Sequence, residues 1–289
     1  MEKFDPKELK KLYRPGKNSH KGENGKLLVI GGSELFHSAS LWALEVASRI
    51  VDMVFYSSVP VNEAIVRKQK ERFHDGIIVP KNKLPEYIEE ADCVLIGPGM
   101  ERSRIRGIKA IKLLKDLRAF APKELMEKGE TGLLVNYLLK KYPNKKWVVD
   151  GGALQVVDKN LLNGKMIITP HHKEYEMLFG LSHTGSVMEM AKKFDCTIVL
   201  KGKEDLICQG DKLVINQTGN EGMTKGGTGD VLAGLVAALY CKNEAFLAAS
   251  CGAYLNGLAG DRLYKQVGRY FNASDLVKEI SRVMGEVLT

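Results

Sequence analysis

The stretch NQTGNEGMTKGGTGD, residues 216–230, leads directly into the apolar helical pattern VLAGLVAALY, residues 231–240. Five glycines in these fifteen residues let a backbone turn tightly and approach a ligand closely. Gly226, Gly227 and Gly229 fall just before or inside the first helical turn, where unpaired amide groups and the helix dipole attract an anion. The stretch therefore predicts a binding site for a phosphate group that is being transferred.

Asp230 belongs to the same first turn and is placed to accept a proton from a hydroxyl that attacks the phosphate. An ordinary helix cap would also explain Thr228 and Asp230. A cap needs only one such residue, however, and not a fifteen-residue glycine-rich approach. We therefore interpret Asp230 as a catalytic base.

Outward from this stretch, short apolar runs alternate with helical patterns along the chain. The runs lack polar alternation, which is typical of strands covered on both faces, and they span residues 26–31, 52–57, 92–96, 146–150, 166–169 and 197–201. Residues 205–209 and 212–215 flank a Gly-Asp turn and predict an antiparallel hairpin near the end of the sheet. Helices are expected over residues 38–50, 105–142, 228–241, 244–264 and 272–285. The pattern predicts one α/β domain over residues 1–289, in three layers with a mostly parallel sheet flanked by helices.

Glycines and polar residues follow five of the predicted strands. In open α/β sheets the ligand lies beyond the carboxyl ends of the strands, and here those ends read GGS at 31–33, GPG at 97–99, DGG at 150–152, TPH at 169–171 and KGK at 201–203. Lys201 or Lys203 could contact a phosphate there. Together these ends predict a binding rim.

The segment TPHHKE, residues 169–174, also predicts a helix start, with Thr169 as the N-cap and Pro170 at the first helical position. That explanation does not require His171, which could donate a hydrogen bond to a substrate. Both interpretations of His171 stay open at this point.

The composition, with 44% hydrophobic and 27% charged residues, is that of an ordinary folded protein, and 7% aromatic residues are too few for a stacking platform along a nucleic acid. No apolar run approaches the roughly 20 residues needed to span a bilayer, and the N-terminus lacks a secretory signal. The five cysteines form no CxxC pair. They predict buried thiols in a reducing compartment, and hence a cytoplasmic protein without a membrane contact.

The net charge of +8 comes largely from residues 102–118, which hold seven Lys or Arg and one Asp. This segment is expected to be a solvated helix face or a subunit contact, so nucleic-acid binding is disfavoured. The sequence has no GxxxxGK[ST], HExxH, GxSxG or DFG motif. GGSELF after the first strand lacks the full GxGxxG fingerprint, which disfavours an enzyme that uses NAD as a hydride carrier.

With these motifs in hand, the chain resembles the ADP- or ATP-dependent NAD(P)H-hydrate dehydratases, which have a ribokinase-like fold. NQTGNEGMTKGGTGDVLAG resembles the family signature, and HKGENGKLLVIGGS, IGPGM, TPHHKE and AYLNGLAGD resemble its other blocks in order. The resemblance covers roughly residues 20–261. It implies a metabolite-repair lyase that phosphorylates the hydroxyl of NADH or NADPH hydrate and eliminates phosphate, restoring the cofactor.

The resemblance also assigns roles. The hydrate of NADH or NADPH would be contacted by Ala39, Gly97, Gly99, His171 and Asp230. The adenine nucleotide would be contacted by Lys201, Gly202, Lys203, Glu204, Asp205, Asn216, Gly226, Gly227, Thr228 and Gly229. Mg²⁺ is expected on the nucleotide phosphates, with no protein ligand identified. Family members often form tetramers, so a homo-oligomer is expected.

Some positions depart from the family pattern. Glu101 follows Met100 where a glycine is usual, DGGALQ replaces DADALN, Glu221 and Lys225 are unusual, and FHSAS, residues 36–40, crowds Ala39. Two alternatives stay open: a small-molecule kinase of the same fold, such as one acting on a vitamin alcohol, and a non-catalytic binder of nucleotide or nucleic acid.

Overall fold

A computed structural model describes residues 2–69, 75–101, 129–180 and 187–288. The predicted basic helix of residues 102–118 therefore lies outside the described residues, as does most of the helical pattern of residues 105–142. Only its last part is described, as helix α6. None of the described helices combines the length and the apolar character needed to cross a membrane.

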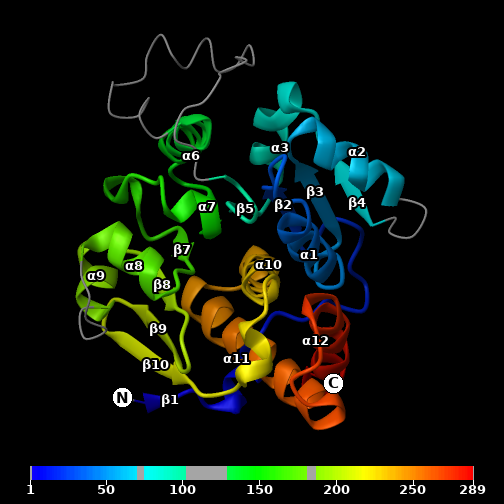
Figure 1. The fold of residues 1–289 in the computed structure, drawn as a ribbon, viewed down its shortest axis with the longest axis vertical. Coiled ribbons are helices and arrows are strands. Elements are labelled where there is room, and N and C mark those ends of the chain that lie inside the picture. Colours follow the sequence, from blue (N-terminus) through cyan, green and yellow to red (C-terminus); the bar gives the residue numbers. More distant parts are fainter. Residues whose placement is uncertain (1, 70–74, 102–128, 181–186, 289) are drawn as a thin grey trace.

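A ten-stranded sheet runs through the described residues in the order β1-β10-β9-β8-β7-β6-β5-β2-β3-β4 (Figure 1). The strands are β1 (Glu2–Lys3), β2 (Lys26–Ile30), β3 (Met53–Ser57), β4 (Gly76–Ile78), β5 (Cys93–Ile96), β6 (Lys146–Val149), β7 (Met166–Ile168), β8 (Thr197–Leu200), β9 (Asp205–Gln209) and β10 (Lys212–Asn216). From β4 to β8 all neighbours are parallel. β9 is antiparallel to both β8 and β10, which confirms the predicted hairpin.

The chain leaves β2 toward β3 and β4, and then returns to build β5 to β8 on the other side. The point where the strand order reverses therefore lies between β2 and β5, which are paired directly. Ligands of open α/β sheets bind outside the carboxyl ends of the strands at such a point. The topology thus predicts a ligand site at Gly31 and Gly32 after β2 and at the loop that follows β5.

Helices cover both faces of the sheet. The helices are α1 (Ser38–Ala47), α2 (Pro60–Gln69), α3 (Leu84–Glu90), α6 (Gly129–Lys141), α7 (Gly151–Leu154), α8 (His172–Phe179), α9 (Val187–Lys193), α10 (Thr228–Lys242), α11 (Ala245–Val267) and α12 (Ala273–Leu288). The buried residues of α1, α10, α11 and α12 form one hydrophobic core with one face of the sheet. Those of α3, α6, α8 and α9 form a second core with the other face. The three-layer α/β architecture is confirmed.

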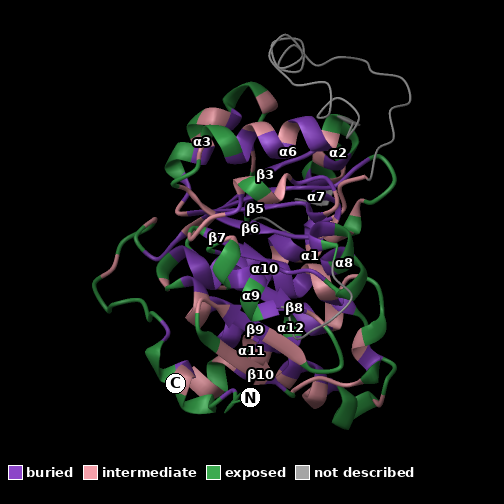
Figure 2. Cartoon of the chain, turned by 90° about the vertical axis from the view of Figure 1, so that its left-hand side faces the viewer, coloured by how far each residue is buried: buried purple, intermediate pink, exposed green. Residues whose placement is uncertain are grey.

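The burial of the strands and helices explains their sequence patterns. The central strands are buried on both faces (Figure 2), so their apolar runs carry no alternation. Helix α10 packs between α1 and α11 and is buried along most of its length, and its sequence is apolar all round. The five cysteines are all free and buried, as predicted, and they are distributed over both cores.

Candidate active site

The ends of five strands meet at one rim, as predicted. The amide of Gly32 donates to the carbonyl of Pro98 at 2.7 Å, which joins the ends of β2 and β5. Gly97 has φ +121°, and a Cβ there would lie 1.8 Å from the carbonyl oxygen of Asp150. Only glycine fits this close approach. His171 and Lys201 form a parallel bridge that extends β7 and β8.

Lys201 lies at the centre of a buried polar cluster. Its ammonium donates to Asp150 Oδ1 at 2.9 Å, and Thr169 Oγ1 donates to the same oxygen at 2.7 Å. Burial by itself would lower the pKa of Lys201, but the carboxylates of Asp150 and Glu174 raise it above its ordinary value. The ammonium also lies 3.5 Å from the place where a Cβ on Gly229 would stand. The ammonium of Lys201 therefore faces the start of α10.

Asp230 is half-buried in the first turn of α10, close to this cluster. Burial raises the pKa of Asp230 to about 7, and the carboxylates of Asp150 and Glu174 add to the rise. Lys201 acts in the opposite direction. A carboxyl group with this pKa can exchange a proton with a substrate at neutral pH, which is the property that a general base needs.

The glycine-rich turn before α10 has the predicted form. Gly227 is the N-cap with φ +99°, and a Cβ there would meet the Trp42 ring at 2.4 Å. Thr228 Oγ1 donates to the carbonyl oxygens of Met223 and Lys225, which holds the turn against the helix. The amide of Thr228 donates to the carbonyl oxygen of Lys225 at 3.4 Å. The next amide of the first turn, that of Gly229, precedes the first helical hydrogen bond and can face an anion beside Lys201.

The predicted helix start at Thr169 and Pro170 is wrong. Helix α8 begins at His172 and its N-cap is His171, whose Nδ1 accepts from the amide of Glu174 at 3.1 Å. Glu174 returns the bond by accepting from the His171 amide at 3.0 Å, which completes a capping box. Thr169 is instead fully buried and bound to Asp150. Thr169 cannot cap the helix because its hydroxyl donates to Asp150 at the end of the strand.

The cap also fixes the tautomer of His171. Because Nδ1 accepts a hydrogen bond, the proton of the neutral ring resides on Nε2. Nε2 lies 3.7 Å from the Glu174 carboxylate, and 47% of the side chain of His171 is exposed. His171 therefore caps the helix, which confirms one of the two roles left open by the sequence. The hydrogen bond from Nε2 to a substrate stays a prediction.

A groove of about 760 Å³ opens next to the start of α10. Seven of the predicted nucleotide contacts line it: Lys201, Gly202, Lys203, Glu204, Asp205, Thr228 and Gly229. The turn of Gly226 and Gly227 precedes the helix and is not part of this lining. Residues 217–221, 223 and 224 also line it. The groove and the anion site thus share Thr228, Gly229 and Lys201.

Asn216 holds the groove together. Its amide nitrogen donates to Asp205 at 3.1 Å and to the carbonyl of Ala253 at 3.2 Å, and its oxygen accepts from Thr218. Asp261 of α11 accepts from the amide of Gly219 at 3.1 Å and from the Asn220 side chain at 3.0 Å. The block AYLNGLAGD, residues 253–261, therefore positions the block NQTGN, residues 216–220.

Ala39 and Gly99 come together on the other side of the rim. A Cβ on Gly99 would lie 3.1 Å from the Ala39 methyl group and 3.0 Å from the carbonyl oxygen of Phe36. Residues 36–40 therefore press on the loop after β5, as the sequence suggested. Phe36 itself is half-exposed beside them.

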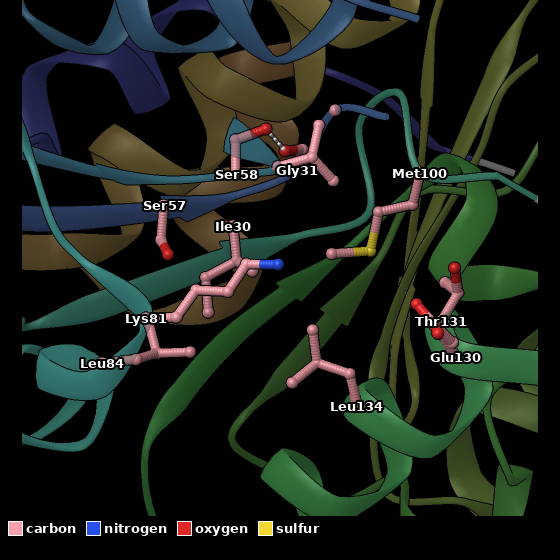
Figure 3. A pocket seen from close by; sticks show the side chains of 12 residues that line it. Ile30, Gly31, Ser57, Ser58, Lys81, Leu84, Met100, Glu130, Thr131 and Leu134 are labelled. Atoms are coloured by element: carbon pink, nitrogen blue, oxygen red, sulfur yellow. Dashed lines mark hydrogen bonds between the residues drawn. The ribbon is translucent and has the colours of Figure 1, made fainter. Parts of the chain in front are cut away.

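A second, smaller cavity of about 120 Å³ lies beside this rim (Figure 3). It is mostly apolar, with Ile30, Leu84 and Leu134 in its wall, and the Lys81 amine points into it. Burial lowers the pKa of Lys81. Leu84 of α3 and Leu134 of α6 line this cavity, whereas α10 packs in the core on the opposite face of the sheet, and no described residue lines both this cavity and the nucleotide groove. It is therefore separate from the nucleotide groove.

Three residues of the site were not singled out from the sequence: Asp150, Glu174 and Asp261. Asp150 was visible only as one strand end among five, and Glu174 only as part of a helix start. Their importance depends on contacts with residues distant in the chain, such as Lys201. A carboxylate at the end of a buried strand was the one local signal that could have identified Asp150.

Residues 27–282 match the family profile described as NAD(P)H-hydrate dehydratase, and the chain belongs to that family. It is 33% identical to the ADP-dependent (S)-NAD(P)H-hydrate dehydratase of Nitrosopumilus maritimus, over 96% of this chain and 94% of that protein. It is 38% identical to the bifunctional NAD(P)H-hydrate repair enzyme Nnr of Methanocaldococcus jannaschii, over 96% of this chain and 51% of that protein. The chain thus spans about half the length of the first curated relatives it matches.

The fold matches the ADP/ATP-dependent NAD(P)H-hydrate dehydratase from Bacillus subtilis that was co-crystallized with ATP/Mg²⁺. The TM-score is 0.77 at 20% identity, with 99% of this chain and 98% of that chain covered. This match confirms the expected ribokinase-like fold.

Proposed function

We propose that this protein uses ADP or ATP to return the hydrate of NADH or NADPH to the intact cofactor. The main support is that Asp230, whose pKa is raised to about 7, lies in the first turn of α10, next to the ammonium of Lys201. Family membership and the dehydratase of Nitrosopumilus maritimus support the choice of reaction.

In the first step Asp230 takes the proton of the substrate hydroxyl. The hydroxyl oxygen forms a bond to the terminal phosphorus of the nucleotide, whose bond to the bridging oxygen breaks. Lys201 and the amides of Gly226–Gly229 stabilise the charge on the transferred group. Lys201 to Asp205 and Asn216 position the nucleotide, and Ala39, Gly97, Gly99 and His171 position the hydrate.

In the second step the lone pair of the adjacent ring nitrogen expels phosphate. The neighbouring carbon then loses a proton, which restores the ring double bond. This step needs a leaving group and room, and no further side chain is assigned to it.

The Bacillus subtilis neighbour was co-crystallized with ATP/Mg²⁺. In the described part of this chain, no group of three or more His, Cys, Asp or Glu side chains is arranged to hold a metal ion. Mg²⁺ would therefore be held mainly by the nucleotide phosphates and water, as is usual for this ion. When bound, it would neutralise charge on those phosphates.

The test supplies purified protein with NADH hydrate and either ADP or ATP, and follows the near-ultraviolet absorbance of NADH. Recovery of the absorbance is expected with at least one nucleotide, and Asp230→Asn should slow it by about a hundredfold or more. Failure with both nucleotides would refute the proposal. A stable phosphorylated product of another alcohol would instead identify a kinase.

We further propose a homo-oligomer in the cytoplasm, a tetramer by resemblance to the family. Light scattering on the purified protein tests the assembly, and a monomer would contradict it.

A further inference from the structure

The nucleotide groove has a charged end and an apolar end. Lys201, Lys203 and Asp205 gather near the start of β9, whereas Met223, Leu232 and Gly257 line the part between α10 and α11. Phosphates suit the first end. A flat ring with apolar faces and a polar edge suits the second.

Asn256 of α11 lines the apolar end and is only 5% exposed. Its side-chain oxygen is buried and has no hydrogen-bond partner. Buried polar atoms in folded proteins are almost always paired. Because Asn256 lines the groove, a ligand bound there is the partner that this acceptor could take.

The other amide side chains of this groove are already engaged in the described structure. Gln217 pairs with Glu204. Asn220 donates to Asp261 and accepts from the amide of Gly222. Their hydrogen bonds hold the wall in place, so Asn256 differs from them in having its acceptor unused.

We propose that Asn256 selects adenine as the base of the nucleotide. A carboxamide offers an acceptor beside a donor, which matches the N6 amine and N7 of adenine in a two-bond pair. Hypoxanthine and guanine carry an oxygen at position 6, which presents a second acceptor to the Asn256 oxygen and forfeits the pair. The inference rests on the proposed nucleotide-dependent function and names the residue that sets its base preference.

The experiment measures the binding of ADP and of inosine diphosphate by calorimetry, without the hydrate. The two nucleotides have the same sugar and phosphates and differ at position 6 of the base. The unmodified protein should bind ADP more tightly by about tenfold to a hundredfold. Asn256→Leu should lose that preference, mainly through weaker ADP binding, and Asn256→Ala serves if the leucine variant does not fold. Asn144→Leu, at an exposed position, is the matched control and should keep the preference.

A preference for ADP that survives in both Asn256 variants would overturn the proposal. Equal weakening of ADP and inosine diphosphate would also overturn it, because the amide would then contact the sugar or phosphates. NADH recovery is measured separately on the unmodified protein. Its absence alongside a lost base preference would refute the proposed function and leave the role of Asn256 supported.

Discussion

Lys201 and Asp150 carry opposite charges and shift the pKa of Asp230 in opposite directions. Asp150 raises the pKa of Asp230 and Lys201 lowers it, while burial provides the largest contribution. The ion pair between Lys201 and Asp150, at 2.9 Å, keeps both charges in the site. The carboxyl proposed as the general base is therefore tuned by the two residues that directly follow β6 and β8.

We expect Asp230→Asn to lower kcat by about a hundredfold or more, the usual contribution of a general base. The same variant should be more stable than the unmodified protein at pH 8. The folded pKa of about 7 exceeds the ordinary value of 3.8, so the fold holds a proton that the unfolded chain releases, and stability falls as the pH rises between these values. Thermal unfolding at pH 8 and at pH 4.5 checks this, with a smaller gain expected at the acidic pH. An equal gain at both would contradict the raised pKa.

The acid limb of the rate profile should respond to the two neighbours in opposite directions. Activity requires ionised Asp230, so kcat/KM should rise with pH through about 7. Asp150→Asn removes a charge that raises the pKa of Asp230 and should move the limb to lower pH. Lys201→Met removes a charge that lowers this pKa and should move the limb to higher pH. Shifts in the same direction in both variants would show that another group controls the limb.

At the scale of elements, helix α8 and the loop before α10 each carry a structural hydrogen bond next to a proposed ligand contact. The capping box of His171 and Glu174 orders the first turn of α8 while presenting Nε2 at the rim. Asp261 of α11 fixes the loop that forms one wall of the groove. Each bond can be removed separately.

His171→Asn and His171→Ala should separate the cap from the substrate contact. Asparagine caps helices well, so His171→Asn should keep its stability, while His171→Ala should lose about 1 kcal/mol of unfolding free energy. Both variants should raise KM for the hydrate, because both lack the Nε2 donor. Urea unfolding and steady-state kinetics measure the two effects. An asparagine variant with unchanged kinetics would limit His171 to its cap.

Asp261→Ala should loosen the groove wall, because the amide of Gly219 and the side chain of Asn220 lose their acceptor. We expect KM for the nucleotide to rise by about tenfold, the effect of one or two hydrogen bonds to a charged group, with kcat changed much less. Glu286→Ala, which removes a surface ion pair with Arg262, is the control and should leave both constants unchanged. A loss confined to kcat would argue against a positioning role.

The sequence predicted the strands and helices that are buried most completely. The apolar runs of β2, β5 and β8 were recognised because both faces of these strands are covered. Short elements such as β4, with three residues, and β1, with two, have no pattern of their own and form by pairing with a neighbour. The sequence predicted the turn at Gly227 and the position of Asp230 in the first helical turn because their signal is local. The contact of Asp150 with Lys201 spans 51 residues and left no such signal.

At the scale of the whole molecule, two hydrophobic cores share one sheet. Both contain residues from the central strands β2, β5 and β6, with alternate side chains pointing to each core. Neither core can open without exposing strands that the other also covers. The single domain over residues 1–289 thus stays a prediction with a physical basis, and it implies cooperative unfolding.

Thiol labelling of the buried cysteines can measure whether unfolding is cooperative. Burial raises the pKa of Cys196 and Cys251 to about 12 and that of Cys208 to about 11, and thiols react as thiolates. A disulfide-exchange dye should therefore leave the native protein unmodified and label all five positions in one phase, at the rate of global opening. Two phases, resolved by mass spectrometry of the labelled peptides, would show that the layers separate one at a time. Because the cysteines are distributed over both cores, their labelling rates report the unfolding of each core separately.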